Sequence, residues 1–276
     1  MIFRMKKYIW ISLSATLPLA LLIIYFILWH KGISAQNKEE FFYVSTGTEK
    51  SELFQKIKNR QDIWSRWGLP IIERLMRFNN DQVKPGRYHW DASISNLDFL
   101  RMIRSGNQKP LPLVLFRAHD LPTLAGLVAN KLEPDSLEFI NFLSKPNTYK
   151  ELGYDEDNFL TLFIPNTYEF FWNTSPEAFL NRMKIEHDRY WTDKRRQALE
   201  EIKLNTKEAY VLASIVEKET QLATERKTIA GVYLNRLKLG MLLQADPTVV
   251  YALRKEGVRR VLNKHLKIDS PYNTYI

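Results

Sequence analysis

The longest apolar stretch of the chain lies near its N-terminus. From Tyr8 to Trp29 there are 22 residues without a charged side chain, and a membrane-spanning helix needs roughly 20. Basic residues are concentrated before this stretch, which by the positive-inside rule keeps the N-terminus in the cytoplasm and exports the rest. A cleaved signal peptide is the alternative, with an apolar region of roughly 7–15 residues. The pattern therefore predicts a cytoplasmic N-terminus over residues 1–7 and a transmembrane helix over residues 8–29.

Short strand-like and helical runs follow in residues 30–117, after a polar tether. The predicted elements are a strand over 41–44, a helix over 51–58, a helix over 70–78 with Pro70 in its first position, a helix capped by Asn96 and ended by Gly106, and a strand over 111–116. Such a mixture predicts a small α+β module of about 75 residues. From residue 118 to residue 276 helical periodicity dominates, so we expect a second, mainly helical domain and an α+β fold overall.

One predicted helix of the second domain carries two glutamates on different sides. Asn205 and Glu208 have the spacing of a capping box at its start. On a helical wheel with about 100° per residue and Val211 at zero, Leu212, Ile215 and Val216 form an apolar stripe between about 40° and 140°. Glu219 falls at about 80°, in the middle of this stripe. Glu217 falls at about 240°, on the side that faces solvent. An inward carboxyl has its pKa raised by desolvation and can act as a proton donor. A buried salt bridge of Glu219 with Arg226 or Arg236 is the equally weighted structural alternative.

Polar side chains gather after the next predicted helix, which runs over 224–239 and closes at Gly240. Gln244, Asp246 and Thr248 lie on the short connection to a third helix, which begins at Asp246-Pro247. Such a connection suits hydrogen bonds to sugar hydroxyls. Helix capping by Asp246 is the alternative, and one residue could do both.

Composition narrows the classes of partner. The chain has 40 Lys and Arg against 31 Asp and Glu, a net charge of +9, and no cysteine. A cysteine-ligated metal and a thiol nucleophile are thereby excluded, and the dispersed histidines lack the spacing of a zinc helix. The charge allows an anionic polymer or lipid as partner, but no zinc-finger spacing, RNA-binding motif or basic stripe indicates nucleic acid. We expect no metal and no cofactor.

Four ordered blocks resemble the motifs of the YceG-like family of endolytic murein transglycosylases. They are Leu212–Thr220 (LASIVEKET), Val232–Leu237 (VYLNRL), Gly240–Val249 (GMLLQADPTV) and Tyr272–Tyr275 (YNTY). The resemblance extends to the apolar N-terminus and to the first module, whose Pro85-Gly86-Arg87-Tyr88 is similar to the signature of that family's LysM-like subdomain. It therefore covers nearly the whole chain.

The resemblance implies cleavage of peptidoglycan glycan strands between N-acetylmuramic acid and N-acetylglucosamine without water, leaving 1,6-anhydro ends. The family's catalytic glutamate matches Glu219, the residue that the helical-face argument also selects. The positions expected to bind glycan are Gln244, Asp246, Thr248, Tyr272, Asn273 and Asn166. Asn166 stands in Pro165-Asn166-Thr167-Tyr168, where the family has Pro-Asp-Thr-Tyr.

The resemblance also implies a place and partners. We expect a single-pass protein of the inner (cytoplasmic) membrane with its C-terminal part in the periplasm, with glycan strands as substrate and a peptidoglycan synthase as candidate partner. The family continues beyond the residue matching Ile276, so the second domain is expected to be truncated. Two alternatives stay open: a non-catalytic glycan-binding or scaffold protein of the same fold, and a basic adaptor in which Glu219 forms only an ion pair.

Overall fold

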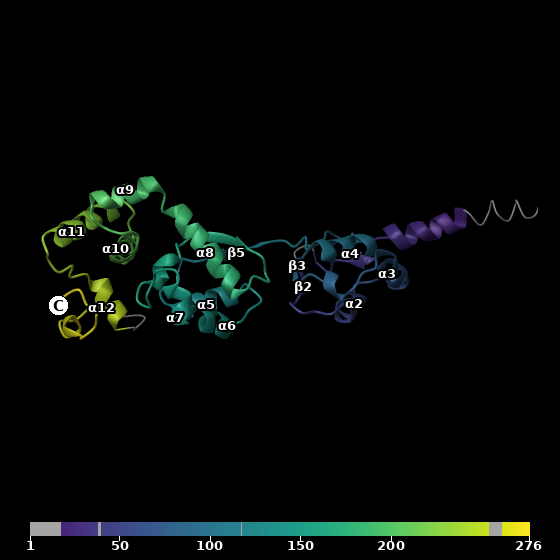
Figure 1. Ribbon diagram of the computed structural model, residues 1–276, viewed down its shortest axis with the longest axis horizontal. Coiled ribbons are helices and arrows are strands. Elements are labelled where there is room, and N and C mark those ends of the chain that lie inside the picture. The colour runs from purple at the N-terminus through teal and green to yellow at the C-terminus, as the bar shows by residue number, and fades with distance from the viewer. Residues whose placement is uncertain (1–17, 38–39, 117, 254–260) are drawn as a thin grey trace, which may run out of the picture. The chain divides into compact units, whose positions relative to one another are not determined.

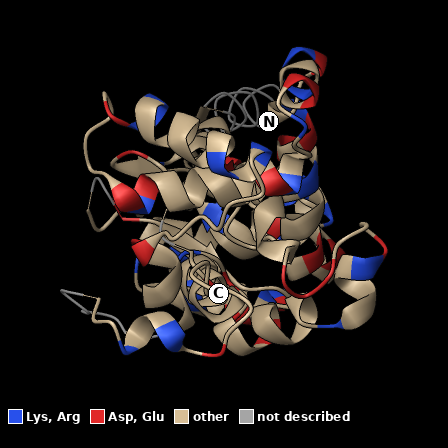
Figure 2. Cartoon of the chain, turned by 90° about the vertical axis from the view of Figure 1, so that its left-hand side faces the viewer, with Lys and Arg blue, Asp and Glu red and all other residues tan. Residues whose placement is uncertain are grey.

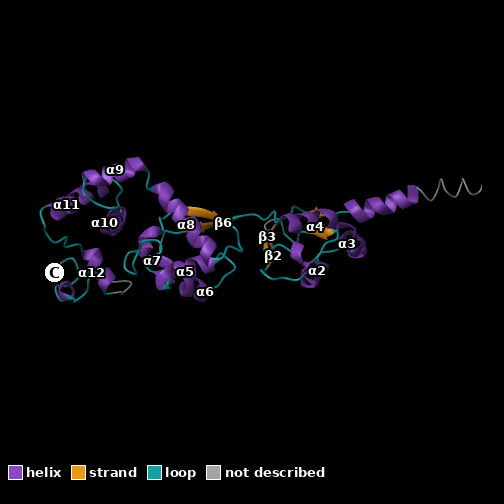
Figure 3. Ribbon diagram, in the orientation of Figure 1, coloured by secondary structure: helices purple, strands orange, loops and turns teal. Residues whose placement is uncertain are grey.

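The computed structural model describes residues 18–37, 40–116, 118–253 and 261–276. Within these ranges the fold is a helix-rich α+β arrangement with small antiparallel sheets of two strands each (Figures 1 and 3). The chain divides into two compact units, Met1–Lys145 with Pro165–Phe179 and Pro146–Ile164 with Leu180–Ile276. This division differs from the predicted boundary between residues 117 and 118, because the first unit extends to Lys145 and residues 165–179 return to it.

The first unit begins with the small module that the pattern predicts. Its elements are β1 (Ile33–Ser34), β2 (Phe42–Val44), α2 (Lys50–Lys58), α3 (Ile63–Met76), a 3-10 turn (Asn80–Gln82), β3 (Gly86–Tyr88), β4 (Ser93–Ile94) and α4 (Asn96–Ser105). Strand β1 pairs with β4 and β2 pairs with β3, with Phe42 opposite Tyr88. The two ribbons and three helices enclose one hydrophobic core that includes Leu53, Ile72 and Phe99.

The helix ends of this module follow local chemistry. Gly106 ends α4 with φ 69, the left-handed conformation that glycine adopts without strain, as predicted. Ser95, one residue before the predicted cap, accepts a hydrogen bond from the Asp98 N–H at the helix start. The predicted helix start at Pro70 is wrong, because Asp62 caps α3 through the Ser65 N–H and places Pro70 inside the helix.

The remainder of the first unit is a two-stranded ribbon with helices. Its elements are β5 (Leu111–Val114), α5 (Leu121–Ala129), α6 (Ser136–Leu143) and β6 (Thr167–Phe170), with the start of α8 (Pro176–Tyr190). Leu111 pairs with Phe170 and Val114 with Thr167, across a sequence separation of more than fifty residues. This pairing holds residues 165–179 in the first unit.

The second unit is almost entirely helical. Beside the remainder of α8 it contains α7 (Pro146–Lys150), α9 (Asp193–Glu201), α10 (Thr206–Glu219), α11 (Arg226–Lys238) and α12 (Asp246–Ala252), with 3-10 turns at Phe159–Leu162 and His265–Lys267. Leu212, Ile215 and Val216 of α10 pack on Tyr233 of α11 and on Ala245 in one small core. This core fixes the three elements that carry the candidate site.

The predicted membrane span is only partly described. Residues 18–29 are helical, whereas residues 8–17 lie outside the described residues. Among the residues that the structure describes, none of the helices combines the length and the apolar composition needed to cross a membrane. The span therefore stays a prediction.

Removing the Phe99 ring should destabilise the first module. The ring is fully buried and makes edge contacts with Phe42 and Trp90, each at 6.0 Å between centroids. Truncation of a buried phenylalanine to alanine costs about 3–5 kcal/mol, so Phe99→Ala should lower the urea midpoint markedly. Leu75→Ala, at an exposed position of α3, should change the free energy of unfolding by less than about 0.5 kcal/mol. Equal effects of the two substitutions would contradict this assignment of the core.

Candidate active site

Helix α10 begins as the sequence predicts. The Asn205 side chain accepts hydrogen bonds from the N–H groups of Lys207 at 2.9 Å and Glu208 at 3.0 Å, and Glu208 Oε2 accepts from the Asn205 N–H at 2.8 Å. This reciprocal capping box satisfies donors that the first helical turn leaves unpaired.

Glu219 is the last residue of α10 and its side chain is exposed, which corrects the predicted inward position. The helical angle gives the direction of a side chain but not how far the core extends along the helix, and the packed face of α10 ends at Val216. Within the described part of the chain, Glu219 forms no ion pair with Arg226 or Arg236, so the buried salt-bridge alternative is also wrong. The Glu219 carboxyl is therefore not enclosed by the core of the second unit.

Tyr233 of α11 lies next to Glu219. Its ring is buried in the small core. Burial, together with the charge and hydrogen bonding of the Glu219 carboxylate, raises the pKa of the Tyr233 hydroxyl to about 12. Glu219 thus has a phenol that stays protonated beside it through the physiological pH range.

Arg236, one turn further along α11, holds the connection to α12. Its Nη1 donates to the carbonyl oxygens of Leu243 at 2.5 Å and Leu242 at 3.3 Å, and to Gln244 Oε1 at 3.3 Å. The Gln244 backbone has φ 51, and its N–H donates to the carbonyl of Thr274 at 3.0 Å. The guanidinium and the C-terminal segment therefore fix Gln244 from two sides.

Thr248 and Asn273 direct their polar groups into the fold. The Thr248 hydroxyl donates to the Ala245 carbonyl at 2.7 Å and lies 2.9 Å from Thr274 Oγ1, which accepts from the Ala245 N–H at 3.0 Å. Asn273 is buried, and its amide donates to the carbonyls of Leu266 and Ile268. The bonds of Thr274 tie residues 261–276 to the start of α12, whereas those of Asn273 lie within that segment. The predicted contacts of Thr248 and Asn273 with glycan stay predictions.

Asp246 pairs with Tyr275. The Tyr275 hydroxyl donates to Asp246 Oδ1 at 2.5 Å. This hydrogen bond, with burial and the negative charges of Asp246 and Glu219, raises the pKa of Tyr275 to about 12, against an opposing effect of Arg236. Asp246 is the first residue of α12 and forms no cap, since Ala245 occupies the cap position without a side-chain bond. The capping alternative for Asp246 is therefore wrong.

The remaining two predicted residues differ in their surroundings. Tyr272 donates to Asp157 Oδ1 at 3.2 Å, and its ring makes an edge contact with Tyr251 at 4.9 Å between centroids. Asn166 belongs to the first unit, directly before β6, where its Oδ1 accepts from the Thr167 N–H. Its predicted role beside the others stays a prediction.

The second unit thus brings Glu219, Tyr233, Arg236, Asp246 and Tyr275 into one cluster. Sequence reasoning singled out Glu219 and Asp246 but missed the two tyrosines and Arg236 as members of the site. These three residues belong to the sequence blocks VYLNRL and YNTY, which carry the resemblance to the YceG-like family. The cluster has two exposed carboxyls. That of Asp246 accepts a hydrogen bond from Tyr275, and that of Glu219 lies beside Tyr233, where it is placed to transfer a proton.

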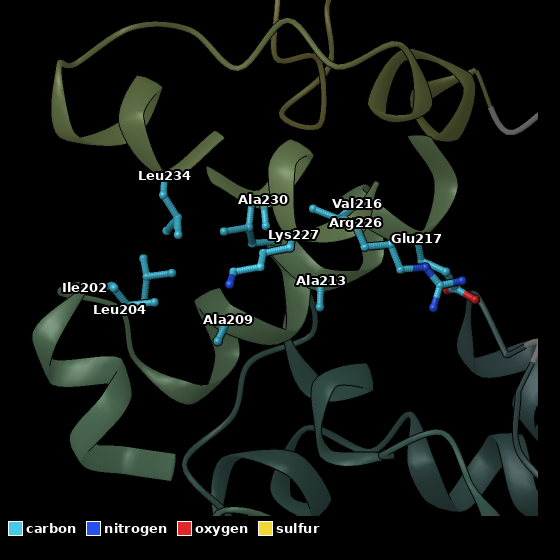
Figure 4. A pocket seen from close by; sticks show the side chains of 11 residues that line it. Ile202, Leu204, Ala209, Ala213, Val216, Glu217, Arg226, Lys227, Ala230 and Leu234 are labelled. Carbon is cyan, nitrogen blue, oxygen red and sulfur yellow. The ribbon is translucent and has the colours of Figure 1, made fainter. Parts of the chain in front are cut away.

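A separate hollow of about 470 Å³ lies along α10 and α11, on the side that carries Glu217 (Figure 4). Its walls are mainly aliphatic, with Leu204, Leu212 and Leu234 among them, and Arg226 and Lys227 are its basic residues. Glu219, Asp246 and Tyr275 do not line it. Aliphatic walls do not suit a polar glycan, so the hollow is distinct from the candidate site.

Comparison with known proteins places the chain in a family. The sequence model of the YceG-like family matches residues 42–276, which include the small module from β2 onward and every member of the cluster. The chain belongs to the YceG-like family. The fold is similar to that in a crystal structure of a yceG-like protein from Listeria monocytogenes, with a TM-score of 0.53 and 24% sequence identity. The match covers 86% of the present chain and 83% of the Listeria chain. That likeness confirms the mixed α+β fold.

Two curated relatives carry the same name. An endolytic murein transglycosylase from Bacillus subtilis is 37% identical over 150 residues, covering 51% of this chain and 40% of the relative. One from Streptococcus pneumoniae is 28% identical over 233 residues, covering 71% of this chain and 41% of the relative. The YceG-like chain therefore spans about two-fifths of the length of the curated relatives that it matches.

The pairing of Tyr275 with Asp246 predicts a late phenol titration. Since an ordinary tyrosine ionises near 10.0 and Tyr275 has a pKa of about 12, the stabilisation is complete below pH 10 and is lost as the pH rises through 12. Asp246→Asn should shift one phenolate absorbance step toward lower pH. In a Tyr275→Phe background the same substitution should shift nothing, and an equal shift there would assign the step to another tyrosine.

Proposed function

We propose that this chain is an endolytic peptidoglycan transglycosylase with Glu219 as its proton-transferring residue. The observation that carries the proposal is the cluster around Glu219, in which an exposed carboxyl lies among hydrogen-bonding groups held by the fold. The names of two relatives and the family match support the same reaction class. The substrate is a glycan strand of alternating N-acetylmuramic acid and N-acetylglucosamine.

The proposed reaction uses one carboxyl group twice. Glu219, in its protonated form, donates its proton to the glycosidic oxygen while the bond from that oxygen to C1 of N-acetylmuramic acid breaks. The C6 hydroxyl oxygen of the same sugar then bonds to C1, and its proton passes to the Glu219 carboxylate. No water is consumed, and the products are a free hydroxyl on one sugar and a 1,6-anhydro ring on the other. Because the nucleophile belongs to the substrate, a second catalytic carboxyl is not required, in contrast to most glycosidases.

Gln244 and Asp246 are proposed to orient the sugar. Within the described residues, Gln244 Nε2 and Asp246 Oδ2 have no partner, while Gln244 Oε1 and Asp246 Oδ1 are held by Arg236 and Tyr275. Each side chain therefore has one fixed end and one available end, a donor in Gln244 and an acceptor in Asp246. A sugar hydroxyl, which both donates and accepts, matches that pair.

We also propose a membrane location. The uncharged stretch over residues 8–29 and the basic residues before it support an anchor in the cytoplasmic membrane with residues 30–276 on its outer side. Such an anchor would keep the enzyme where new glycan strands emerge. A synthase partner stays a prediction.

Two glutamates near the end of α10, Glu219 and Glu217, provide a matched test of the reaction. Glu219→Gln should reduce the release of anhydro-ended fragments from purified glycan strands by about 10²–10⁴-fold, the usual contribution of a general acid. Glu217→Gln, two residues away and also exposed, should retain the activity of the unchanged chain. Mass spectrometry distinguishes anhydro ends from hydrolysis products, which are heavier by one water.

Two outcomes would contradict the proposal. Equal activity of both variants would remove Glu219 from the reaction. A folded chain that sediments with glycan strands but releases no fragments would instead be a glycan-binding protein of the same fold.

A further inference from the structure

Helix α3 has an exposed side made of large apolar residues. Ile63, Trp67, Ile71 and Leu75 recur every four positions, and Trp64 adds to the same side. At about 100° per residue these five span an arc of about 120°. Trp67 is 74% exposed and Leu75 is 67% exposed. We refer to these five residues as the α3 apolar face.

This face is separate from the core of the module. The core side of α3 is formed by Ser65, Gly68, Leu69 and Ile72, all of them buried. A helix that packs one side on a core and turns the other to water carries polar residues on the outer side. Two tryptophans and three aliphatic residues on that outer side therefore indicate a partner other than water.

The helix of residues 18–29 lies against the same part of α3. The ring centroids of Phe26 and Trp64 are 6.0 Å apart, and a Cβ on Gly68 would lie 3.5 Å from the carbonyl oxygen of Ile27. His30, just after this helix, lies 2.5 Å from Asp62, the cap of α3. The helix thus contacts the first turns of α3, and together with the α3 apolar face it forms one apolar surface.

The exposed large residues of that helix extend the surface. They are Leu19, Leu21, Leu22, Ile23, Ile24, Tyr25, Phe26 and Trp29. No charge lies among them. A surface that continues from an uncharged, predicted membrane helix onto a neighbouring helix rich in tryptophan matches the interface between lipid tails and headgroups, where tryptophan is enriched.

Basic residues border the face. From Lys56 to Arg77 the sequence has six Lys and Arg against two Asp and Glu, a net charge of +4. Within the described residues, Arg66, Arg74 and Arg77 are exposed and have no acidic partner. Over the chain as a whole acidic and basic residues are interspersed (Figure 2), so this border is a local excess. Arginine beside an apolar face is typical of helices that lie in an anionic membrane surface.

We propose that α3 lies in the surface of a bilayer containing anionic phospholipid, with the α3 apolar face toward the acyl chains. The inference rests on the membrane anchor of the proposed function and is independent of glycan cleavage. It gives the small module a second membrane contact beside the anchor. The module is then held against the bilayer by two contacts, the anchor and α3.

Single labels on a chain without cysteine test this contact. The full chain has no cysteine, so Leu75→Cys and Leu137→Cys can each carry one nitroxide without background. The two leucines match, since both are on helices of the first unit and are 67% and 68% exposed. The full chain is reconstituted into vesicles of phosphatidylethanolamine and phosphatidylglycerol, and its sedimentation with them reports the anchor.

For each label, the accessibility to oxygen is divided by the accessibility to a water-soluble nickel chelate. This ratio should be severalfold higher for the label at residue 75 than for the label at residue 137. Equal, water-like ratios in chains that sediment with the vesicles would overturn the contact while leaving the anchor intact. A label at residue 75 shielded from both reagents, more so as protein per lipid increases, would assign the face to a second copy. Chains that stay in the supernatant would overturn both the anchor and the contact.

Discussion

The guanidinium of Arg236 fixes the part of the second unit on which the candidate site depends. Residues 241–245 have no regular secondary structure, yet they carry Gln244 and lead directly to Asp246. One nitrogen of Arg236 donates to three acceptors of this segment. The positions of Gln244 and of the start of α12 at Asp246 thus depend on this one side chain.

The two glutamates near the end of α10 have different surroundings, and only Glu219 belongs to the candidate site. They are about 200° apart around the helix, so Glu219 lies with Tyr233 and Tyr275 while Glu217 borders the aliphatic hollow. Glu219 is open to solvent in the free chain. In the proposed reaction the glycan itself would cover the carboxyl and exclude water from it, so the low-polarity surroundings of a proton donor would form only when the strand binds.

Helix ends that depend on hydrogen bonds between sequence neighbours could be predicted from the sequence. The exposure and partners of side chains, which depend on tertiary packing, could not. The capping box of Asn205 and the left-handed end at Gly106 follow from local hydrogen bonding, and both are confirmed. The sequence predicts a helix start at Pro70 because proline suits the first turn, but the cap at Asp62 lies about two turns earlier. The solvent exposure of Glu219 depends on where α10 extends beyond the core, and the partner of Asp246 depends on where residues 272–275 pack. Neither can be read from the residues next to Glu219 or Asp246 in the sequence.

Gln244 occupies a backbone conformation, φ 51, that L residues other than asparagine and aspartate seldom adopt. Holding it there costs about 1–3 kcal/mol, a cost that glycine would avoid. A glycine at this position would ease the turn and abolish the amide that Arg236 orients. Stability and the proposed sugar recognition therefore oppose each other at this turn. Selection of this protein for heat resistance alone would favour loss of the Gln244 side chain, and with it the donor proposed to bind the sugar.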